Sequence, residues 1–379
     1  MITTLAASGY RSLVDVVLPL GQTTVVTGPN GSGKSNLYRA LRLLAAAASG
    51  STVGSIAAEG GLDSVLWAGP ETPQGGVAQG TVRTRPVAVK LGFASDELGY
   101  LIELGLPQAD QGSLFGRDPE IKIEQVFSGP FSKPATAFVD RHRAGVRVRD
   151  GGWRALGQSL APFQTILTDI ADADATLELL SLRRQLQGWR FYDHFRTDRD
   201  APSRHPQIGT RTPHLAHDGR DLAAAWATVE DAGLGEGLAR EVSRAFPGSR
   251  VEVAVERGAF RIRMHQPGLL RPLEASELSD GTLRYLLLVA ALLPAQPAPF
   301  VVLNEPESSL HPELLEPLGR LIVAASAHSQ VLVVTHAEAL HAALESAGAD
   351  SVVLSSGASG TRVEGQGMLD QPPWRWPAR

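Results

Sequence analysis

A glycine-rich segment near the N-terminus constrains the fold of this chain more than any other feature. It reads Gly28-Pro29-Asn30-Gly31-Ser32-Gly33-Lys34-Ser35 and matches the phosphate-loop pattern G-x-x-x-x-G-K-[ST]. A β-branched run at 23–27 precedes it, and apolar residues with helical spacing follow it at 37–44. A strand, a glycine-rich turn and a helix in this order predict a loop whose backbone N–H groups surround a polyphosphate.

The side chains of this loop have separate expected roles. Lys34 is expected to reach the outer phosphates, and the Ser35 hydroxyl is expected to complete the shell of a Mg²⁺ ion. The remaining contacts with the nucleotide are expected from the rest of the loop and the residue after it, namely Asn30, Gly31, Ser32, Gly33 and Asn36. A chance glycine-rich turn is the alternative, and the flanking strand and helix argue against it.

The composition excludes several other kinds of chemistry. The 379 residues include no cysteine, so disulfides, zinc–thiolate sites and thiolate catalysis are excluded. The net charge of −5 gives the chain as a whole no attraction for nucleic acid, although local basic patches can still bind it. No secretory signal is visible, and the apolar runs are too short to cross a bilayer. We therefore expect a cytoplasmic protein without a membrane segment.

Two kinds of hydrophobic pattern divide the chain. Alternating stretches predict an antiparallel meander of strands within 2–20, 81–106, 121–126 and 137–148, with a loop rich in glycine and serine at 49–61. From Pro162 onward helical spacing dominates. Helices are expected at 177–186, 222–232 and 236–245, and two strands are expected at 251–255 and 260–264.

A continuous apolar run at 300–303 is typical of a buried parallel strand, and 330–334, apolar after Gln330, is expected to be a second buried strand. Glu305 follows the first run and His336 follows the second, so both side chains are expected at the carboxyl edge of a sheet, where ligands bind. Glu305 is the expected general base for an attacking water, and His336 is expected to contact the γ-phosphate or the water. A solvated glutamate and a structural histidine are the alternatives.

A short polar segment, Leu278-Ser279-Asp280-Gly281-Thr282, leads into an apolar helix at 283–293. Ser279 and the N-terminus of that helix together form an anion site. The alternative interpretation is a capped helix start after a turn.

In this order, the motifs resemble those of the ABC-type ATPases of the RecF and SMC group, most closely the stand-alone AAA-family predicted ATPases of bacteria. The resemblance identifies 278–282 as the signature, Asn304–Pro312 as Walker B and D-loop, and His336 as the switch histidine. It implies an α/β P-loop fold in which lobe I combines a parallel core sheet with an antiparallel layer. Lobe I would comprise 1–155 and 294–379, and a mostly helical lobe II would comprise 156–293.

The resemblance also implies a reaction cycle. ATP and Mg²⁺ would be bound, a head-to-tail homodimer would close on ATP, and hydrolysis would open it. Ser279 and Gly281 of one subunit would meet the γ-phosphate that the other subunit binds. Two positions depart from the family pattern. Asn304 stands where an aspartate usually helps to hold the metal, and the Q-loop glutamine, a nucleotide and metal contact, is assigned to Gln164 with Gln125 as the alternative.

Two functions remain open from the sequence. One is an ATPase coupled to DNA repair, recombination or anti-phage defence, and the other is a slow ATP-gated switch or sensor whose partner protein carries the effector activity. A transporter ATPase is less favoured, because its lobe insert is usually shorter. The region 183–211 interleaves arginines with aromatic residues, which suits DNA phosphate contact and base stacking. A solvated face or a protein interface would suit the same residues.

Overall fold

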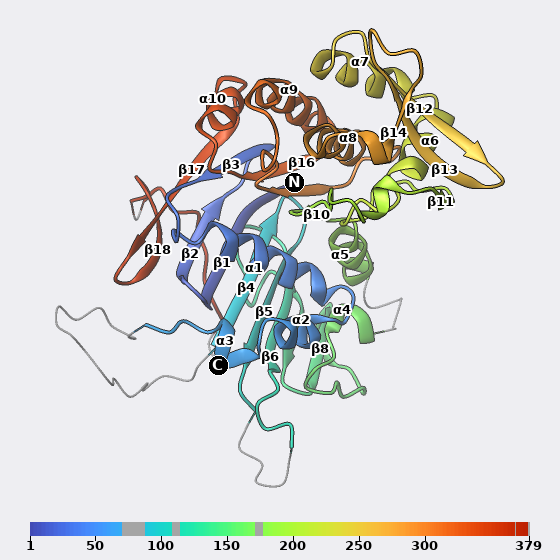
Figure 1. Ribbon diagram of the computed structural model, residues 1–379. Helices are drawn as coiled ribbons and strands as arrows, with labels where there is room; N and C mark the ends of the chain where they lie inside the picture. The colour runs from blue at the N-terminus through green and yellow to red at the C-terminus, as the bar shows by residue number, and fades with distance from the viewer. Residues whose placement is uncertain (70–87, 108–113, 171–176, 368, 378–379) are drawn as a thin grey trace. The chain divides into compact units, whose positions relative to one another are not determined.

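The structure is a computed structural model that describes residues 1–69, 88–107, 114–170, 177–367 and 369–377 (Figure 1). Its residues cluster into two compact units. Unit one comprises Met1–Gly21, Thr27–Trp189 and Val352–Arg379, and unit two comprises Gln22–Val26 and Arg190–Ser351. The three-part division into lobes predicted from the sequence stays a prediction.

Unit one is built on an eight-stranded antiparallel sheet with the strand order β2-β1-β4-β5-β6-β7-β8-β9. The predicted antiparallel meander is therefore confirmed, and its part at 81–87 lies outside the described residues. The strands are β1 (Ile2–Tyr10), β2 (Leu13–Pro19), β4 (Ala88–Ser95), β5 (Gly99–Gly105), β6 (Glu120–Phe127), β7 (Ala137–His142), β8 (Gly145–Asp150) and β9 (Gly152–Ala155).

Helices cover part of this sheet. Helix α1 (Lys34–Ala47) packs on β1 and β4, as Figure 1 shows, and buries Leu37, Leu41 and Leu44. The prediction of a loop at 49–61 is wrong, because Thr52–Ala58 forms helix α2 with Ile56 buried. Burial of that side chain outweighs the weak helix propensity of the surrounding glycine and serine. The other helices of unit one are α3 (Leu62–Val65), α4 (Ile166–Asp169) and α5 (Leu177–Gln187).

The C-terminal part of the chain returns to unit one. Strands β17 (Asp350–Gly357) and β18 (Gly360–Val363) form a hairpin, and β18 lies along β2. The tail then packs Trp374 and Trp376 on a buried cluster that includes Phe127. A side chain at Gly92 would place a Cβ 2.6 Å from the Trp374 ring, so the tail lies directly against the sheet.

Unit two contains a parallel sheet with the strand order β10-β15-β16-β3. Its strands are β10 (Arg190–Tyr192), β15 (Phe300–Asn304), β16 (Gln330–Val334) and β3 (Thr23–Thr27). All of β16 is buried, and so is β15 up to Leu303, which confirms the two parallel strands predicted from continuous apolar runs. At Thr27 the chain leaves unit two and enters the phosphate loop.

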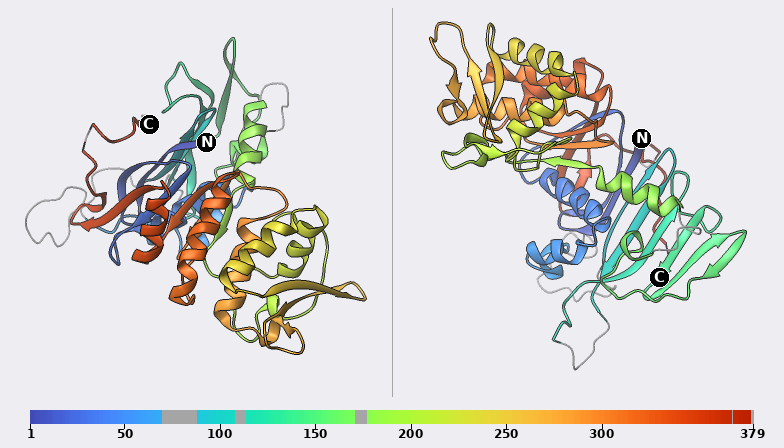
Figure 2. Two further views of the ribbon diagram at one scale, coloured as in Figure 1. Left: turned by 90° about the horizontal axis from the view of Figure 1, so that it is seen from above. Right: turned by 90° about the vertical axis from the view of Figure 1, so that its right-hand side faces the viewer.

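A second sheet in unit two has the order β11-β13-β12, with β14 paired to β13. Helices α6 (Leu222–Asp231) and α7 (Gly235–Ala245) lie beside its β12–β13 hairpin (Figure 2). The strands are β11 (Gln207–Ile208), β12 (Arg250–Glu256), β13 (Ala259–His265) and β14 (Leu273–Glu274). The two helices and two longer strands match those expected from the sequence.

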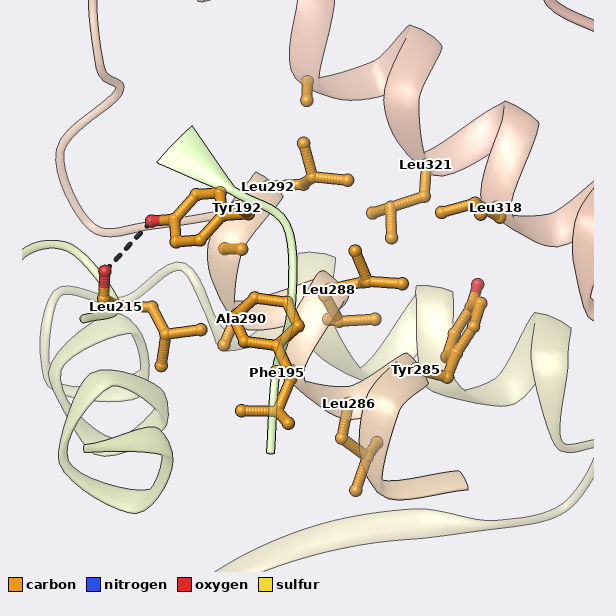
Figure 3. Close-up of a cluster of buried hydrophobic side chains, with 14 of the residues drawn as sticks. Tyr192, Phe195, Leu215, Tyr285, Leu286, Leu288, Ala290, Leu292, Leu318 and Leu321 are labelled. Carbon is orange, nitrogen blue, oxygen red and sulfur yellow. Dashed lines mark hydrogen bonds between the residues drawn. The ribbon is translucent and has the colours of Figure 1, made fainter. Parts of the chain in front are cut away.

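The core of unit two surrounds helix α8 (Asp280–Leu292), which is buried from Leu283 to Leu292. Leucines of α9 (Leu315–Ser326) and the rings of Tyr192, the last residue of β10, and Phe195 belong to the same cluster (Figure 3). The Tyr192 hydroxyl donates a hydrogen bond to the Leu215 carbonyl at 3.0 Å, which satisfies its polar atom inside this core. The last helix of the unit is α10 (Glu338–Ser346).

Candidate active site

The phosphate loop of unit one depends on glycines at two close backbone approaches. Gly28 has φ 142° and Gly33 has φ 104°, both in the region that favours glycine. A Cβ at Gly28 would lie 2.1 Å from the Leu354 carbonyl oxygen, and one at Gly33 would lie 2.2 Å from Thr361 Oγ1. Any side chain at either position would therefore displace the β17–β18 hairpin.

Lys34 holds the loop in its curled conformation. Its side chain is buried, and Nζ donates hydrogen bonds to the carbonyls of Gly28 and Pro29, the latter at 3.1 Å. Ser32 Oγ is also buried, and no protein group in the described part of the chain bonds to it. An ammonium, a buried hydroxyl and a helix N-terminus on one tight loop fit a polyphosphate ligand.

A hydrogen-bonded chain supports the loop from behind. Asn36 Nδ2 donates to Ser12 Oγ at 2.9 Å, and Ser12 Oγ lies 2.8 Å from Thr361 Oγ1. Thr361 Oγ1 in turn donates to the Ser32 carbonyl at 2.8 Å. Asn36 is thus a support of the loop in this structure. Ser12 and Thr361 were not predicted from the sequence, because no motif marks them and neither belongs to the loop segment of the chain.

Glu305 and His336 lie together at the carboxyl edge of the parallel sheet in unit two. The Glu305 N–H donates to the Val334 carbonyl at 2.7 Å, and Glu305 Oε1 lies 3.8 Å from His336 Nδ1. Glu305 has φ 48°, a conformation that costs a non-glycine residue about 1–3 kcal/mol and often marks functional sites. The Thr335 N–H donates to the Val26 carbonyl of β3, two residues before the phosphate loop begins.

Asn304, at the end of β15, has a buried amide oxygen. No hydrogen-bond donor within the described residues reaches its Oδ1 atom. Mg²⁺ prefers oxygen ligands, and this amide oxygen of unit two is of that kind, as is the exposed Ser35 hydroxyl of unit one, each considered by itself. Across the described ranges, no group of three or more His, Asp or Glu residues could hold a metal ion.

Ser279 is the N-cap of α8, as the capped-helix interpretation expected. Its Oγ accepts a hydrogen bond from the Thr282 N–H at 3.2 Å and lies 2.8 Å from Thr282 Oγ1. The residue is exposed, at the N-terminus of a long helix. A Cβ at Gly281 would lie 3.0 Å from the Ser309 carbonyl, so the signature and the D-loop approach closely inside unit two. The role of Ser279 and Gly281 toward a second subunit's nucleotide stays a prediction.

Gln164 is held by local contacts in unit one. Its Oε1 accepts from the Ala161 N–H at 2.8 Å, and its Nε2 donates to Asp169 Oδ1 at 2.8 Å. The alternative, Gln125, donates to Asp140 and accepts from Ser132. Both glutamines therefore have protein partners here, and the Q-loop assignment stays a prediction.

The prediction that aromatic residues of 183–211 stack on bases is wrong for most of these residues. Trp189, Tyr192 and Phe195 are 4%, 3% and 2% exposed, because they fill the cores of their units. Buried rings cannot stack on bases. Phe191 is partly buried.

Arg204 is likewise a structural residue, not a phosphate contact. It is 8% exposed, and its guanidinium donates to the carbonyls of Ala275 at 3.0 Å and Leu278 at 2.7 Å. It also donates to Asp280 Oδ1 at 2.6 Å. These hydrogen bonds of Arg204 hold the signature segment 278–282 in place.

Arg284, which was not predicted from the sequence, connects the signature helix to the Glu305 turn. It lies on α8 and is 3% exposed, and its guanidinium donates to the carbonyls of Asp193 at 3.3 Å and Glu305 at 3.2 Å. Burial lowers the pKa of Arg284, and Glu307, Asp193 and Glu305 oppose that shift by their charge. A basic residue within an otherwise apolar helix is the sequence signal that could have identified it.

Residues 23–340 match the family described as "AAA domain, putative AbiEii toxin, Type IV TA system". No curated protein matches. Among the described residues, no helix has the length and apolar content required to cross a membrane.

Two similar solved structures are SMC head domains. One is an SMC head bound to the C-terminal winged-helix domain of ScpA, at 17% identity, with 96% of this chain and 97% of that chain covered and a TM-score of 0.50. The other is a Pyrococcus furiosus Smc head with an extended coiled coil, bound to the C-terminal domain of ScpA, at 16% identity, with 96% and 95% covered and a TM-score of 0.50. At such low identity the likeness establishes the fold alone, and it confirms the predicted ABC-type α/β fold. Since the family match covers most of its length, the chain belongs to this AAA family.

Proposed function

We propose that this chain is a Mg²⁺-dependent ATP hydrolase that closes as a head-to-tail homodimer when it binds ATP. Lys34 and the backbone N–H groups of the phosphate loop bind the phosphates, and Ser35 and Asn304 contribute to the metal shell. Glu305 accepts the proton of the attacking water, while His336 contacts the γ-phosphate or orients the water. A bound metal ion would neutralise charge on the phosphate oxygens.

The observation that carries this proposal is the edge of the parallel sheet in unit two. Glu305 and His336 lie 3.8 Å apart there, and the strand next to His336, β3, continues directly into the phosphate loop. Phosphoryl transfer requires positioning and charge more than covalent chemistry. A carboxylate and an imidazole at a strand edge that leads into a phosphate loop meet that requirement.

The dimer is proposed from the exposed α8 N-terminus. Ser279 caps this helix with its side chain at the surface, so the helix N-terminus and the hydroxyl can receive an anion from outside the chain. In the proposed closed state that anion is the γ-phosphate of ATP on a second copy. Gln164 is proposed to contact the nucleotide and the metal after release from its bonds to Ala161 and Asp169.

The proposal is tested by nucleotide binding and turnover of Lys34→Ala beside the wild-type chain. ATP binding should be lost in the variant, because the loop loses its one positive side chain and the contacts that hold its curl. Arg42→Ala, on the same helix, is the matched control and should bind ATP normally. Unchanged ATP affinity in Lys34→Ala would remove the basis of the proposal.

A second candidate is a slow ATP-gated switch or sensor whose partner protein carries the effector activity. The observation that favours it is Asn304, whose neutral amide replaces a charged metal ligand and should slow turnover. The two candidate functions differ in the expected rate of ATP hydrolysis and in its response to DNA. Turnover that rises with DNA supports the enzyme, whereas slow turnover indifferent to DNA, with ATP-dependent dimerisation, supports the switch.

DNA and an effector protein remain the proposed partners, in a cytoplasmic role in DNA repair, recombination or anti-phage defence. Of the arginines in 183–211, Arg184, Arg196, Arg199 and Arg211 are exposed, and Arg196 and Arg211 pair with aspartates. If DNA binds there, Arg196→Glu with Arg199→Glu should weaken binding and reduce its salt dependence. Absence of DNA binding by the wild-type chain at low salt would exclude this partner.

A further inference from the structure

Glu307 is a buried carboxylate that binds the segment containing His336. Its side chain is 6% exposed, and Oε1 accepts hydrogen bonds from Thr335 Oγ1 at 2.6 Å and from the His336 N–H at 3.1 Å. The other oxygen, Oε2, is buried and has no donor among the residues that the structure describes. Glu307 thus joins the turn after β15 to the end of β16.

The same carboxylate faces the imidazole of His336. His336 Nδ1 lies 3.4 Å from Glu307 Oε1 and 3.8 Å from Glu305 Oε1, so Glu307 is the nearer of the two. A carboxylate beside one ring nitrogen favours the proton on that nitrogen, which leaves the other nitrogen for a different partner. This arrangement determines which tautomer of a neutral histidine is present.

A structural role alone does not account for the charge of Glu307. Burying a carboxylate is costly, and a glutamine amide oxygen could accept the same bonds from Thr335 and His336 with a smaller penalty. Arg284 offsets part of that cost by its charge, although its hydrogen bonds go to the carbonyls of Asp193 and Glu305. Besides Arg284, the negative charge faces the imidazole of His336, whose Nδ1 lies 3.4 Å from Glu307 Oε1.

We propose that Glu307 is the positioning residue of His336, an inference that rests on the proposed ATP hydrolysis. It fixes the turn at Thr335 and His336 and holds the Nδ1 proton, so that Nε2 is the nitrogen that acts on the γ-phosphate or the water. Glu305 is then not required to orient the imidazole and serves as the general base. The division of labour between the two carboxylates follows from their burial, because Glu305 is 40% exposed and Glu307 is 6% exposed.

A double-mutant cycle tests the kinetic part of the proposal. Glu307→Gln should lower kcat about tenfold with the ATP dissociation constant unchanged, a loss below the full effect of a general acid–base group. In a His336→Ala background the same substitution should have no further effect, because its target is gone. Equal effects in the two backgrounds would overturn the proposal.

The matched control is Glu241→Gln. Glu241 is also buried in unit two, one of its oxygens is bonded to Arg244, and it lies in α7, outside the candidate site. The Glu241→Gln substitution should leave kcat unchanged. A loss of kcat in this control as large as in Glu307→Gln would mean that removal of any buried charge, and not positioning of His336, explains the result.

A spectroscopic measurement tests the proposal independently of turnover. The ten histidines can be labelled with ¹⁵N, and the His336 signals identified by their loss in His336→Ala. Neutral His336 should carry its proton on Nδ1 in the wild-type chain and shift toward the Nε2 tautomer in Glu307→Gln. The same tautomer in both would overturn the inference even if ATP hydrolysis is confirmed. A wild-type chain without ATPase activity but with this tautomer shift would instead overturn the proposed function alone.

Discussion

Arg204→Met is expected to destabilise unit two and to loosen the signature segment. The guanidinium donates to two buried carbonyls, those of Ala275 and Leu278, and to the carboxylate of Asp280. Methionine retains much of the apolar stem but leaves both carbonyls without this donor. Each should cost about 1–3 kcal/mol, which gives about 2–6 kcal/mol in total. Asp280 adds little, because its side chain is 63% exposed.

Urea unfolding followed by tryptophan fluorescence, to which the buried Trp226 of unit two contributes, measures this cost. Arg199→Met is the control, since Arg199 is exposed and its substitution should change the free energy of unfolding by less than about 0.5 kcal/mol. ATP-dependent dimerisation of Arg204→Met should also weaken, because Leu278 and Asp280 flank Ser279. A loss of less than about 1 kcal/mol would refute the assigned hydrogen-bond role.

Three further substitutions test separate parts of the site. Asn304→Asp should lower the Mg²⁺ concentration needed for half-maximal turnover, and lost activity with unchanged Mg²⁺ dependence would contradict the metal assignment. Ser279→Arg should retain ATP binding but block ATP-dependent dimerisation, measured by light scattering; a normal dimer would reduce Ser279 to a helix cap. Arg284→Met should lower kcat about tenfold or more with ATP affinity retained, because the Glu305 turn loses a buried charged donor. Loss of ATP affinity with kcat unchanged would refute that role.

Much of the fold could be predicted because the relevant signals are local. Each of three patterns reflects the surroundings of its own segment. They are the glycines and lysine of 28–35, the apolar runs of β15 and β16, and the alternation along β4 to β8. The helix Thr52–Ala58 was missed because its formation depends on burial of Ile56, and a composition of glycine, serine and alanine does not reveal burial.

The supporting residues of the site could not be predicted, because their roles come from contacts between distant segments. Arg204 has the appearance of a surface arginine in an arginine-rich loop, yet it bonds to carbonyls more than seventy positions away in the chain. Thr361 Oγ1 donates a hydrogen bond to the Ser32 carbonyl of the phosphate loop, although most of the sequence separates the two residues. Such partners follow from tertiary packing, which no spacing rule expresses.

The most direct test of the central claim is the rate of phosphate release from ATP by Glu305→Gln and by the wild-type chain, at saturating ATP and Mg²⁺. If Glu305 is the general base, the substitution keeps the shape of the side chain and removes the proton acceptor. The rate should then fall by about 10²- to 10⁴-fold, with the ATP dissociation constant unchanged and an ATP-bound dimer accumulating. Phosphate release by Glu305→Gln at the wild-type rate would contradict the account.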